Sequence, residues 1–236
     1  MSHQTLTQAL LTELTAQGAD LAGAGDLRAL PAGTREGLPV GVAVAVAYPK
    51  KVIRGIAQLP TRDYLDAYHR MNAQLDGIVA AGARWLEARG FRAVAQTLAY
   101  AARFEEMYAT RLPHKTVATR AGLGWIGKSA LLVTPACGPM VRLSSLLTDA
   151  PLDCAAPTDE SLCGACAACA QACPGGAISG LAWHAGLARE AFFDAAACRQ
   201  TARARALEGF GIEISQCGKC IEVCPYTRHY LGGTGT

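Results

Sequence analysis

The cysteines constrain what this chain can fold into more than any other residues. Eight of the ten lie between positions 163 and 224. The first run reads Cys163-x2-Cys166-x2-Cys169-x3-Cys173-Pro174. The second run reads Cys217-x2-Cys220-x3-Cys224-Pro225, with Cys198 standing upstream of it. Thiolate runs with this spacing bind cubane 4Fe-4S clusters, each of which takes four thiolates. The sequence therefore predicts a module that is folded around two clusters.

The spacing also predicts which cysteines share a cluster. In such runs the first three cysteines hold one cluster, and the fourth, which precedes a proline, reaches across to the other. We therefore assign cluster one to Cys163, Cys166, Cys169 and Cys224. We assign cluster two to Cys173, Cys198, Cys217 and Cys220. Cys137 and Cys154 remain, and each is interpreted as a buried or incidental thiol.

Zinc ribbons and disulfides are the alternative interpretations of these cysteines. Zinc sites usually combine two separated Cys-x2-Cys pairs, which leaves the triple spacing and both Cys-Pro steps unexplained. Disulfides suit a secreted chain. Positions 1–24 show no basic head followed by a continuous apolar core, so neither a signal peptide nor a twin-arginine leader is expected. The cytoplasm is the expected location, and its reducing conditions favour cluster ligation.

The composition disfavours several classes of protein. With 236 residues and 51% hydrophobic content, the chain can bury a sizeable core and add a small module to it. A net charge of +3 creates no strong field for nucleic acid or anionic lipid. Arg189, Arg199, Arg203 and Arg205 form a modest basic stretch, interpreted as a solvated helix face. The longest apolar run, 40–48, has about half the length that a membrane-spanning helix needs, so a soluble protein is expected.

Apolar periodicity predicts a mixed α/β chain. It indicates helices over 4–17, 61–90 and 99–108, and strands over 40–47, 91–95, 131–134 and 141–147. The valine-rich strand over 40–47 is expected to be covered on both faces, and the Gly-, Ala- and Pro-rich stretch up to Pro39 to be a connection. A linker composition over 148–161 predicts a boundary near Asp149, between a domain over 1–149 and a module over 150–236. That module needs little secondary structure, because metal sites replace a core.

A glycine-rich loop precedes the cysteines. Gly122-Leu-Gly-Trp-Ile-Gly127-Lys128-Ser129 matches two nucleotide-binding patterns, G-x-G-x-x-G and G-x-x-x-x-G-K-[ST]. Both patterns require a buried strand before the loop, and 114–120 is too polar to be one. A triphosphate site also requires a magnesium-binding aspartate, for which Asp149 is a poor candidate. A purely structural turn is a further alternative. Close glycine backbone, an indole and an ammonium together suit a flat, phosphate-bearing cofactor.

The segment from Ala121 to Val133, followed by the double cysteine run, resembles the epoxyqueuosine reductases. These are cobalamin-dependent enzymes that make the last reduction to the queuosine base of tRNA, and reductive dehalogenases are more distant relatives. The resemblance extends from about Gly18 to Tyr226. It implies a nitroreductase-like domain that holds base-off cobalamin, followed by a ferredoxin-like module whose nearer cluster passes electrons to cobalt. The residues expected around the corrinoid are His114, Lys115, Ala121, Gly122, Leu123, Gly124, Trp125, Gly127 and Lys128.

The chain departs from this family in two respects. Counting back without gaps from Ala121 places Tyr108 where those reductases have an acidic residue, the proposed proton donor, and His114 where they have a glutamate. Glu105 and Glu106 replace the acid only if the loop is shifted. Tyr108 is our candidate proton donor, by similarity to the tyrosine of reductive dehalogenases, with a packing role as the alternative. The chain also stops shortly after the cysteines, without the further helices of many relatives. Both departures disfavour tRNA as the substrate.

Two functions remain open at the level of the sequence. The first is a cobalamin-dependent iron-sulfur reductase that acts on a small organic or modified-nucleoside substrate and takes electrons from an external low-potential donor, a ferredoxin or flavodoxin. The second is a non-catalytic iron-sulfur protein that passes electrons to a partner or reduces a partner's corrinoid. A plain ferredoxin would explain only residues 163–226. The sequence does not decide the substrate, the lower axial ligand of cobalt or whether the chain forms a homodimer, as nitroreductase-like folds often do.

Overall fold

The computed structural model describes residues 2–103 and 109–232. These residues form two compact units that alternate along the chain. The first unit comprises Met1–Val46, Met71–Gly124 and Arg142–Thr158, and the second comprises Ala47–Arg70, Trp125–Val141 and Asp159–Thr236, apart from the positions outside the described residues. A functional division of the chain near Asp149 stays a prediction.

A four-stranded sheet forms the centre of the first unit. Its strands follow the order β1 (Leu21–Asp26), β2 (Val40–Ala47), β6 (Val141–Thr148) and β3 (Ala93–Ala95). β1 pairs antiparallel with β2, and β3 pairs antiparallel with β6. β2 is buried at seven successive positions, so the prediction of a strand covered on both faces is confirmed. The predicted strands over 91–95 and 141–147 correspond to β3 and β6.

β1 corrects our interpretation of the Gly- and Ala-rich stretch as a connection. Its sequence, Leu-Ala-Gly-Ala-Gly-Asp, lacks the β-branched and aromatic residues that mark strands. The packing explains the glycines, because a Cβ at Gly25 would lie 2.4 Å from the carbonyl carbon of Arg120, and one at Gly23 would lie 2.9 Å from the carbonyl oxygen of Ala121. The end of the neighbouring helix α5 (His114–Arg120) thus approaches the strand too closely for any side chain.

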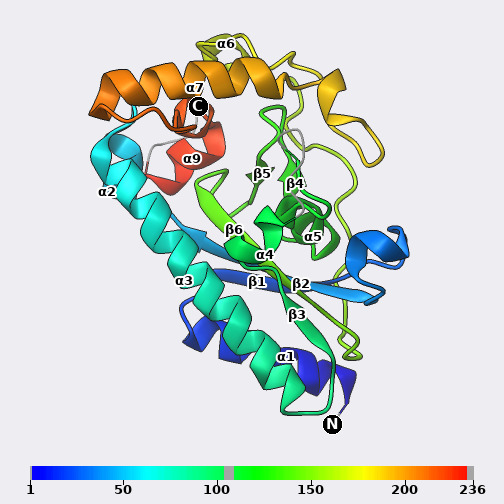
Figure 1. Cartoon of the computed structure of the whole chain (residues 1–236). Helices are drawn as coiled ribbons and strands as arrows, with labels where there is room; N and C mark the ends of the chain where they lie inside the picture. The colour runs from blue at the N-terminus through cyan, green and yellow to red at the C-terminus, as the bar shows by residue number, and fades with distance from the viewer. Residues whose placement is uncertain (1, 104–108, 233–236) are drawn as a thin grey trace. The chain divides into compact units, whose positions relative to one another are not determined.

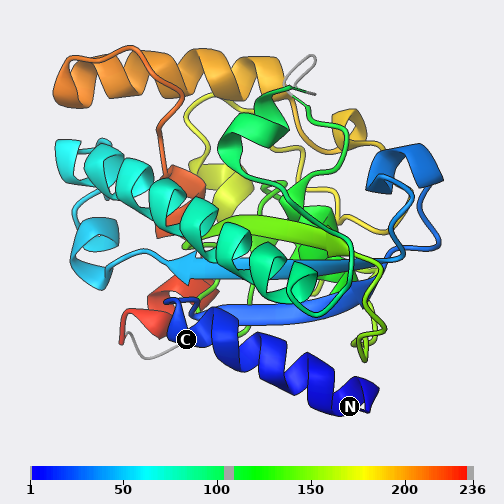
Figure 2. The ribbon, with the colours of Figure 1, turned by 60° about the horizontal axis from the view of Figure 1, so that its bottom comes forward.

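Helices cover both faces of this sheet. In β6, Leu146 approaches Gly82 of α3 (Arg62–Glu87), whereas the preceding residue, Ser145, contacts His114 of α5. Successive strand residues point to opposite faces, so α3 and α5 lie on opposite sides. α1 (His3–Ala16) also contacts β1, and its Leu10 and Leu14 approach Gly82 of α3 (Figures 1 and 2). The helices predicted over 4–17 and 61–90 are therefore confirmed as α1 and α3.

Short elements complete the first unit. η1 (Ala32–Arg35) is a 3-10 turn, and α4 (Leu98–Ala102) begins after Thr97, whose hydroxyl accepts a hydrogen bond from the backbone N–H of Tyr100. α4 occupies the first part of the helix predicted over 99–108. Positions 104–108 lie outside the described residues.

The second unit is built from short elements around the cysteines. A small hairpin pairs β4 (Trp125–Ile126) with β5 (Leu132–Val133), which confirms the strand predicted over 131–134. The short helices are α2 (Lys50–Arg54), α6 (Ala168–Ala172), η2 (Arg189–Ala191), α8 (Lys219–Glu222) and α9 (Pro225–Tyr230). Ile126, Ala130 and Phe192 form a minor apolar core.

α7 (Ala195–Phe210) corrects the expectation of little secondary structure after the boundary. This helix has 16 residues. Asp194 caps its start by accepting a hydrogen bond from the N–H of Ala197, and Gly211 ends it in the left-handed conformation. In the described residues, no helix is long and apolar enough to cross a membrane.

Candidate functional site

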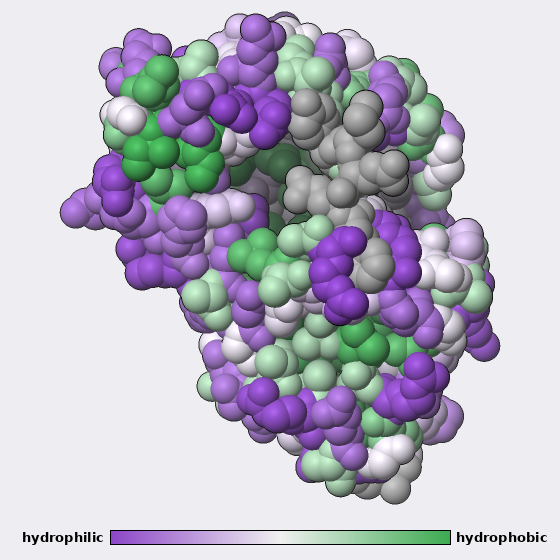
Figure 3. All heavy atoms as spheres, in the orientation of Figure 1, coloured by the Kyte–Doolittle hydropathy of each residue, from purple (hydrophilic) through white to green (hydrophobic). Residues whose placement is uncertain are grey.

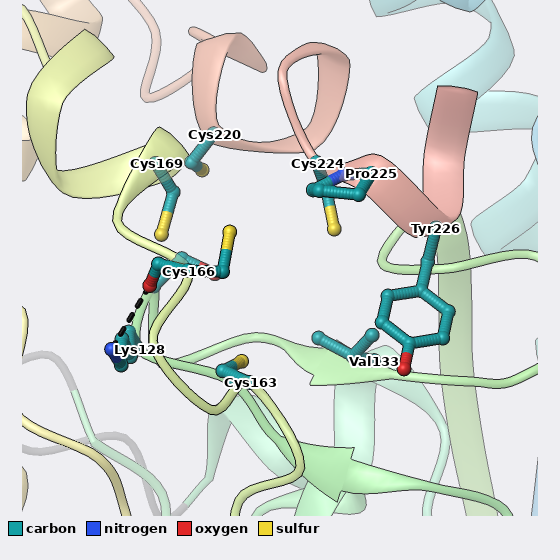
Figure 4. A pocket seen from close by; sticks show the side chains of 11 residues that line it. Lys128, Val133, Cys163, Cys166, Cys169, Cys220, Cys224, Pro225 and Tyr226 are labelled. Carbon is teal, nitrogen blue, oxygen red and sulfur yellow. Dashed lines mark hydrogen bonds between the residues drawn. The ribbon is translucent and has the colours of Figure 1, made fainter. Parts of the chain in front are cut away.

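Four cysteines converge on one pocket in the second unit. Cys163, Cys166, Cys169 and Cys224 line this pocket, together with Cys220. Figure 4 shows the sulfur atoms of these four side chains pointing into the same space, with Cys220 behind Cys169. These are the four cysteines that the spacing assigns to cluster one. The structure therefore brings together thiols that are up to 61 positions apart in the sequence, counting from Cys163 to Cys224.

Local backbone chemistry sets the directions of these side chains. Gly164 adopts a φ of +51°, which turns the chain between Cys163 and Cys166. Cys169 lies in α6, whose end is Cys173. Cys224 is the N-cap residue of α9, and Pro225 occupies the first helical position, where its missing N–H costs nothing. The Cys-Pro step thus starts a helix away from the pocket while the Cys224 thiol stays in it.

The other four assigned cysteines also lie near one another. The pKa of Cys198 is raised to about 11, first by burial and then by the neighbouring Cys173 and Cys217. Burial also raises the pKa of Cys220, with further contributions from Cys198, Cys217, Cys169 and Cys173. Cys220 therefore lies between the two groups of thiols, which places the second group beside the first.

The chemistry of the pocket fits a cluster better than a single ion. Burial, together with the adjacent Cys163, Cys224 and Cys166, raises the pKa of Cys169 to about 11. Such a thiol becomes a thiolate only when a metal replaces its proton. Zinc binds thiolates at about 2.3 Å and would draw four sulfurs tightly around one point. Among the described residues, no three His, Cys, Asp or Glu side chains converge in that way. The four sulfurs instead surround a space that a cubane would fill.

The glycine loop follows a helix and not a strand. α5 occupies 114–120, so the strand that both nucleotide-binding patterns require is absent from the described residues before the loop. Gly122 and Gly124 adopt φ values of +67° and +159°. A Cβ at Gly122 would lie 3.0 Å from the carbonyl oxygen of Ala156. Ala121 is buried and Leu123 half-buried in the same unit. Internal packing therefore explains at least part of this loop.

The second half of the loop belongs to the cysteine pocket. Gly127 and Lys128 both line it, and a Cβ at Gly127 would lie 2.7 Å from Cγ2 of Val133 and 3.5 Å from Sγ of Cys163. Trp125 is buried, and its ring meets that of Tyr226 edge-on at 5.0 Å between centroids. Its indole N–H has no hydrogen-bond partner among the described residues. Gly127 and Lys128 thus lie at the pocket proposed for cluster one, and the expected contact of the loop with the corrinoid stays a prediction.

His114 and Lys115 begin α5 in the first unit, and both are half-buried. Nδ1 of His114 lies 2.9 Å from Oγ of Ser145, and the Ser145 hydroxyl donates a hydrogen bond to the side-chain oxygen of Gln96. Burial and, to a lesser extent, the nearby Arg142 cation together lower the pKa of His114 to about 4. His114 is therefore a neutral imidazole at pH 7. The sequence analysis did not anticipate this network, because Ser145 looked like an ordinary strand residue.

The remaining candidates either lie outside the described residues or do not line the pocket. Tyr108, Glu105 and Glu106 lie outside the described residues. Cys137 is buried in the turn between β5 and β6, where its N–H donates a hydrogen bond to the hydroxyl of Thr134. Cys154 is half-buried in the first unit, and burial raises its pKa. Neither cysteine lines the described pocket.

Comparisons with known proteins identify the cysteine-rich segment. Residues 162–227 match the 4Fe-4S double cluster binding domain. The epoxyqueuosine reductase of Synechococcus sp. (strain CC9605) is 37% identical over 133 residues, which cover 52% of this chain and 38% of that protein. The enzyme of Listeria monocytogenes is 45% identical over 64 residues, which cover 27% of this chain and 17% of its own length. The chain thus spans less than half the length of these relatives.

Solved structures share the fold of the whole chain. A catabolic reductive dehalogenase superimposes with a TM-score of 0.74 at 20% identity, over 96% of this chain and 32% of the dehalogenase. Epoxyqueuosine reductase from Streptococcus thermophilus gives a TM-score of 0.60 at 19% identity, over 95% of this chain and 67% of its own. The predicted fold class is therefore confirmed. The chain is similar in sequence to the epoxyqueuosine reductases, has the fold they share with reductive dehalogenases, and matches a 4Fe-4S double cluster binding domain over residues 162–227.

Proposed function

We propose that this protein is a cobalamin-dependent iron-sulfur reductase of the epoxyqueuosine reductase type, acting in the cytoplasm. The observation that carries the proposal is the convergence of Cys163, Cys166, Cys169 and Cys224 on one pocket, with a second group of thiols beside it. The match of residues 162–227 to a double cluster binding domain supports the same assignment. Cys173, Cys198, Cys217 and Cys220 are the proposed ligands of cluster two.

The protein shields the two proposed clusters from solvent and holds their binding sites next to each other. Most of the cluster ligands are half-buried, which limits access of water and oxygen to the sulfurs. Cys220, proposed for cluster two, also lines the pocket proposed for cluster one, so the two sites are adjacent in the second unit. Clusters bound at adjacent sites exchange single electrons, which is the chemistry that they would supply here.

Cobalamin is the second cofactor of the proposal. The support is the sequence similarity to epoxyqueuosine reductases and a fold shared with a dehalogenase whose reaction is described as B12-dependent. The glycine loop is joined directly to the pocket, because Gly124 is followed by Trp125 and then by Gly127 and Lys128 at the cluster. The resemblance implies that the corrinoid would be bound base-off. Ala121 to Gly124 are the loop residues proposed to border it.

We favour a small organic or modified-nucleoside substrate over a large RNA. The basic residues of α7 are engaged within the protein: Arg203 forms an ion pair with Glu213, and Arg205 donates a hydrogen bond to the carbonyl of Gln58. Figure 3 shows hydrophilic residues intermixed with hydrophobic ones around α7, where Leu207 is 53% exposed. The pairing of Arg203 and Arg205 within the protein leaves α7 with fewer cations available to bind phosphates.

An assay of the reconstituted protein with three substrates tests the activity. The full chain, loaded anaerobically with iron, sulfide and cobalamin, receives electrons from a low-potential chemical donor. It is then offered an epoxyqueuosine-modified tRNA stem loop, the free modified nucleoside and 3-bromo-4-hydroxybenzoic acid, all compounds of the kinds bound by the structural relatives. Cobalamin-dependent conversion of the nucleoside or the aryl bromide supports the proposal. Conversion of the stem loop alone would contradict the small-substrate part.

The second candidate function is a non-catalytic electron-transfer protein. It is favoured by Tyr108, which stands where the related reductases have an acidic proton donor. In that case the protein would oxidise the donor and reduce a second redox protein, yet convert none of the three substrates. In a preparation that does convert a substrate, a Tyr108→Phe variant tests the phenol: loss of turnover with unchanged cluster content supports a catalytic phenol, and unchanged turnover excludes it.

A further inference from the structure

Lys128 is a buried cation at the edge of the cluster-one pocket. Its residue is 8% exposed, and of the charged side chains that the structure describes it is the one that reaches the buried class. Nζ donates hydrogen bonds of 2.9 Å to the carbonyl oxygens of Gly164 and Cys166, and Figure 4 draws the bond to Cys166. Both carbonyls belong to the loop that joins the first two cysteines of the pocket. Lys128 therefore holds the backbone of the ligand loop.

The ammonium has no carboxylate to balance its charge. Among the described residues, no Asp or Glu lies within ion-pair distance of Lys128, whereas Lys219, which also belongs to the second unit, pairs with Glu222 at 2.8 Å. Burying an isolated ammonium costs several kcal/mol unless an opposite charge or several dipoles compensate it. Two carbonyl dipoles provide part of that compensation. The rest requires a nearby negative group, and the pocket that Lys128 lines is surrounded by four thiols.

We propose that Lys128 sets the reduction potential of cluster one and positions its ligand loop. This inference rests on the two-cluster part of the proposed function and not on cobalamin. A cubane held by four thiolates is negatively charged and gains one further negative charge on reduction. A fixed cation beside it stabilises the reduced form more than the oxidised form, because the attraction grows with the charge. With the cluster bound, Lys128 would therefore raise the reduction potential of cluster one.

The same geometry explains the pattern Gly127-Lys128-Ser129. In a phosphate-binding loop, glycine allows close approach of the backbone and lysine contacts an anion. Here the close approach is between Gly127 and both Val133 and Sγ of Cys163, and the anion that we assign to Lys128 is the cluster. The glycine and the lysine thus have the same roles as in a phosphate-binding loop, with an iron-sulfur cluster proposed in place of the nucleotide.

Redox titration of three Lys128 variants tests the inference. Lys128→Met removes the charge and both hydrogen bonds, Lys128→Gln removes the charge but keeps a hydrogen-bond donor, and Lys128→Arg keeps the charge. Lys51→Met is the matched control, because it removes an exposed ammonium from the same unit. The full chain of each variant is reconstituted anaerobically, its iron is counted, and the potentials of both clusters are followed by electron paramagnetic resonance.

We expect cluster one to become harder to reduce in the Met and Gln variants, while cluster two and the Lys51→Met control keep the wild-type potentials. Lys128→Arg should restore the potential of cluster one. Full iron content with unchanged potentials in both Lys128→Met and Lys128→Gln would overturn the inference. If Lys128→Met loses the iron of cluster one, the potential of cluster one in Lys128→Gln decides the test, and an unchanged potential there would overturn the inference. A wild-type protein without clusters would instead refute the proposed function, and wild-type clusters without cobalamin binding would leave this inference standing.

Discussion

At the scale of single residues, the proposed ligands differ from the two spare cysteines in their surroundings. Cys198 is the least obvious ligand, because it lies outside both runs, in the first turns of α7. Its thiol is close to Cys173 and Cys217, which raise its pKa in addition to burial. Cys154, in the first unit, instead has Asp26, Arg28 and Asp153 as its charged neighbours.

We therefore predict that Cys198→Ser loses about half of the bound iron, because cluster two lacks one thiolate. Cys154→Ser, the matched control, should keep the wild-type content. Iron and acid-labile sulfide analysis of anaerobically reconstituted protein measures both. Wild-type iron in Cys198→Ser would show that cluster two uses another ligand.

His114 should make the stability of the protein depend on pH. Its pKa is lowered from 6.5 to about 4 by burial, so the unfolded chain binds a proton more readily than the folded protein. The contribution of neutral His114 to the free energy of unfolding is fully present above pH 6.5, and it is lost as the pH falls from there through about 4. The total loss is on the order of 1 to 3 kcal/mol.

Urea unfolding at pH 7 and pH 4.5, without clusters, measures this effect. We expect the free energy of unfolding to fall less between these two values in His114→Asn than in the wild type. Equal decreases in the two proteins would show that groups other than His114 cause the loss of stability at low pH.

At the scale of secondary-structure elements, close packing of β1 against α5 should make its glycines indispensable. Gly25→Ala places a methyl group 2.4 Å from the backbone of Arg120, so we predict a loss of stability of roughly 1 to 3 kcal/mol or more. Gly77→Ala in α3 is the control, since a Cβ there meets nothing within 4 Å. It should be neutral or stabilise the protein by about 0.5 to 1 kcal/mol. Chemical denaturation measures both, and an equally stable Gly25→Ala would contradict the described packing.

The same elements show how far the sequence determines the fold. β2 and α3 could be predicted because their apolar residues follow the periods of a covered strand and an amphipathic helix. β1 could not be predicted, because its close contact with α5 leaves room only for glycines, and the strand then lacks the β-branched and aromatic residues typical of strands. α7 was missed because its alternating Ala and Arg residues show no clear apolar face. The contact between His114 and Ser145 joins residues 31 positions apart, which a one-dimensional pattern does not bring together.

The candidate site was predictable to a similar degree. Cysteine spacing indicated all eight proposed ligands, because metal coordination imposes strict distances along the chain. The role of Lys128 was not indicated, because its partners are backbone carbonyls, which leave no mark in a sequence. The spacing of residue types in a sequence can indicate metal ligands, whereas side-chain contacts with backbone carbonyls can be found only in the structure.

At the scale of the whole molecule, one unit contains a four-stranded sheet and the other is built around two groups of thiols. Our central claim is that this protein holds two clusters together with a corrinoid. Anaerobic titration of the reconstituted full chain with cobalamin, followed by ultraviolet-visible spectroscopy alongside iron and sulfide analysis, tests this claim most directly. The account predicts about eight iron atoms per chain and a shift of the added cobalamin to its base-off spectrum. The same iron content with an unperturbed cobalamin spectrum would contradict it, and would leave an electron-transfer protein.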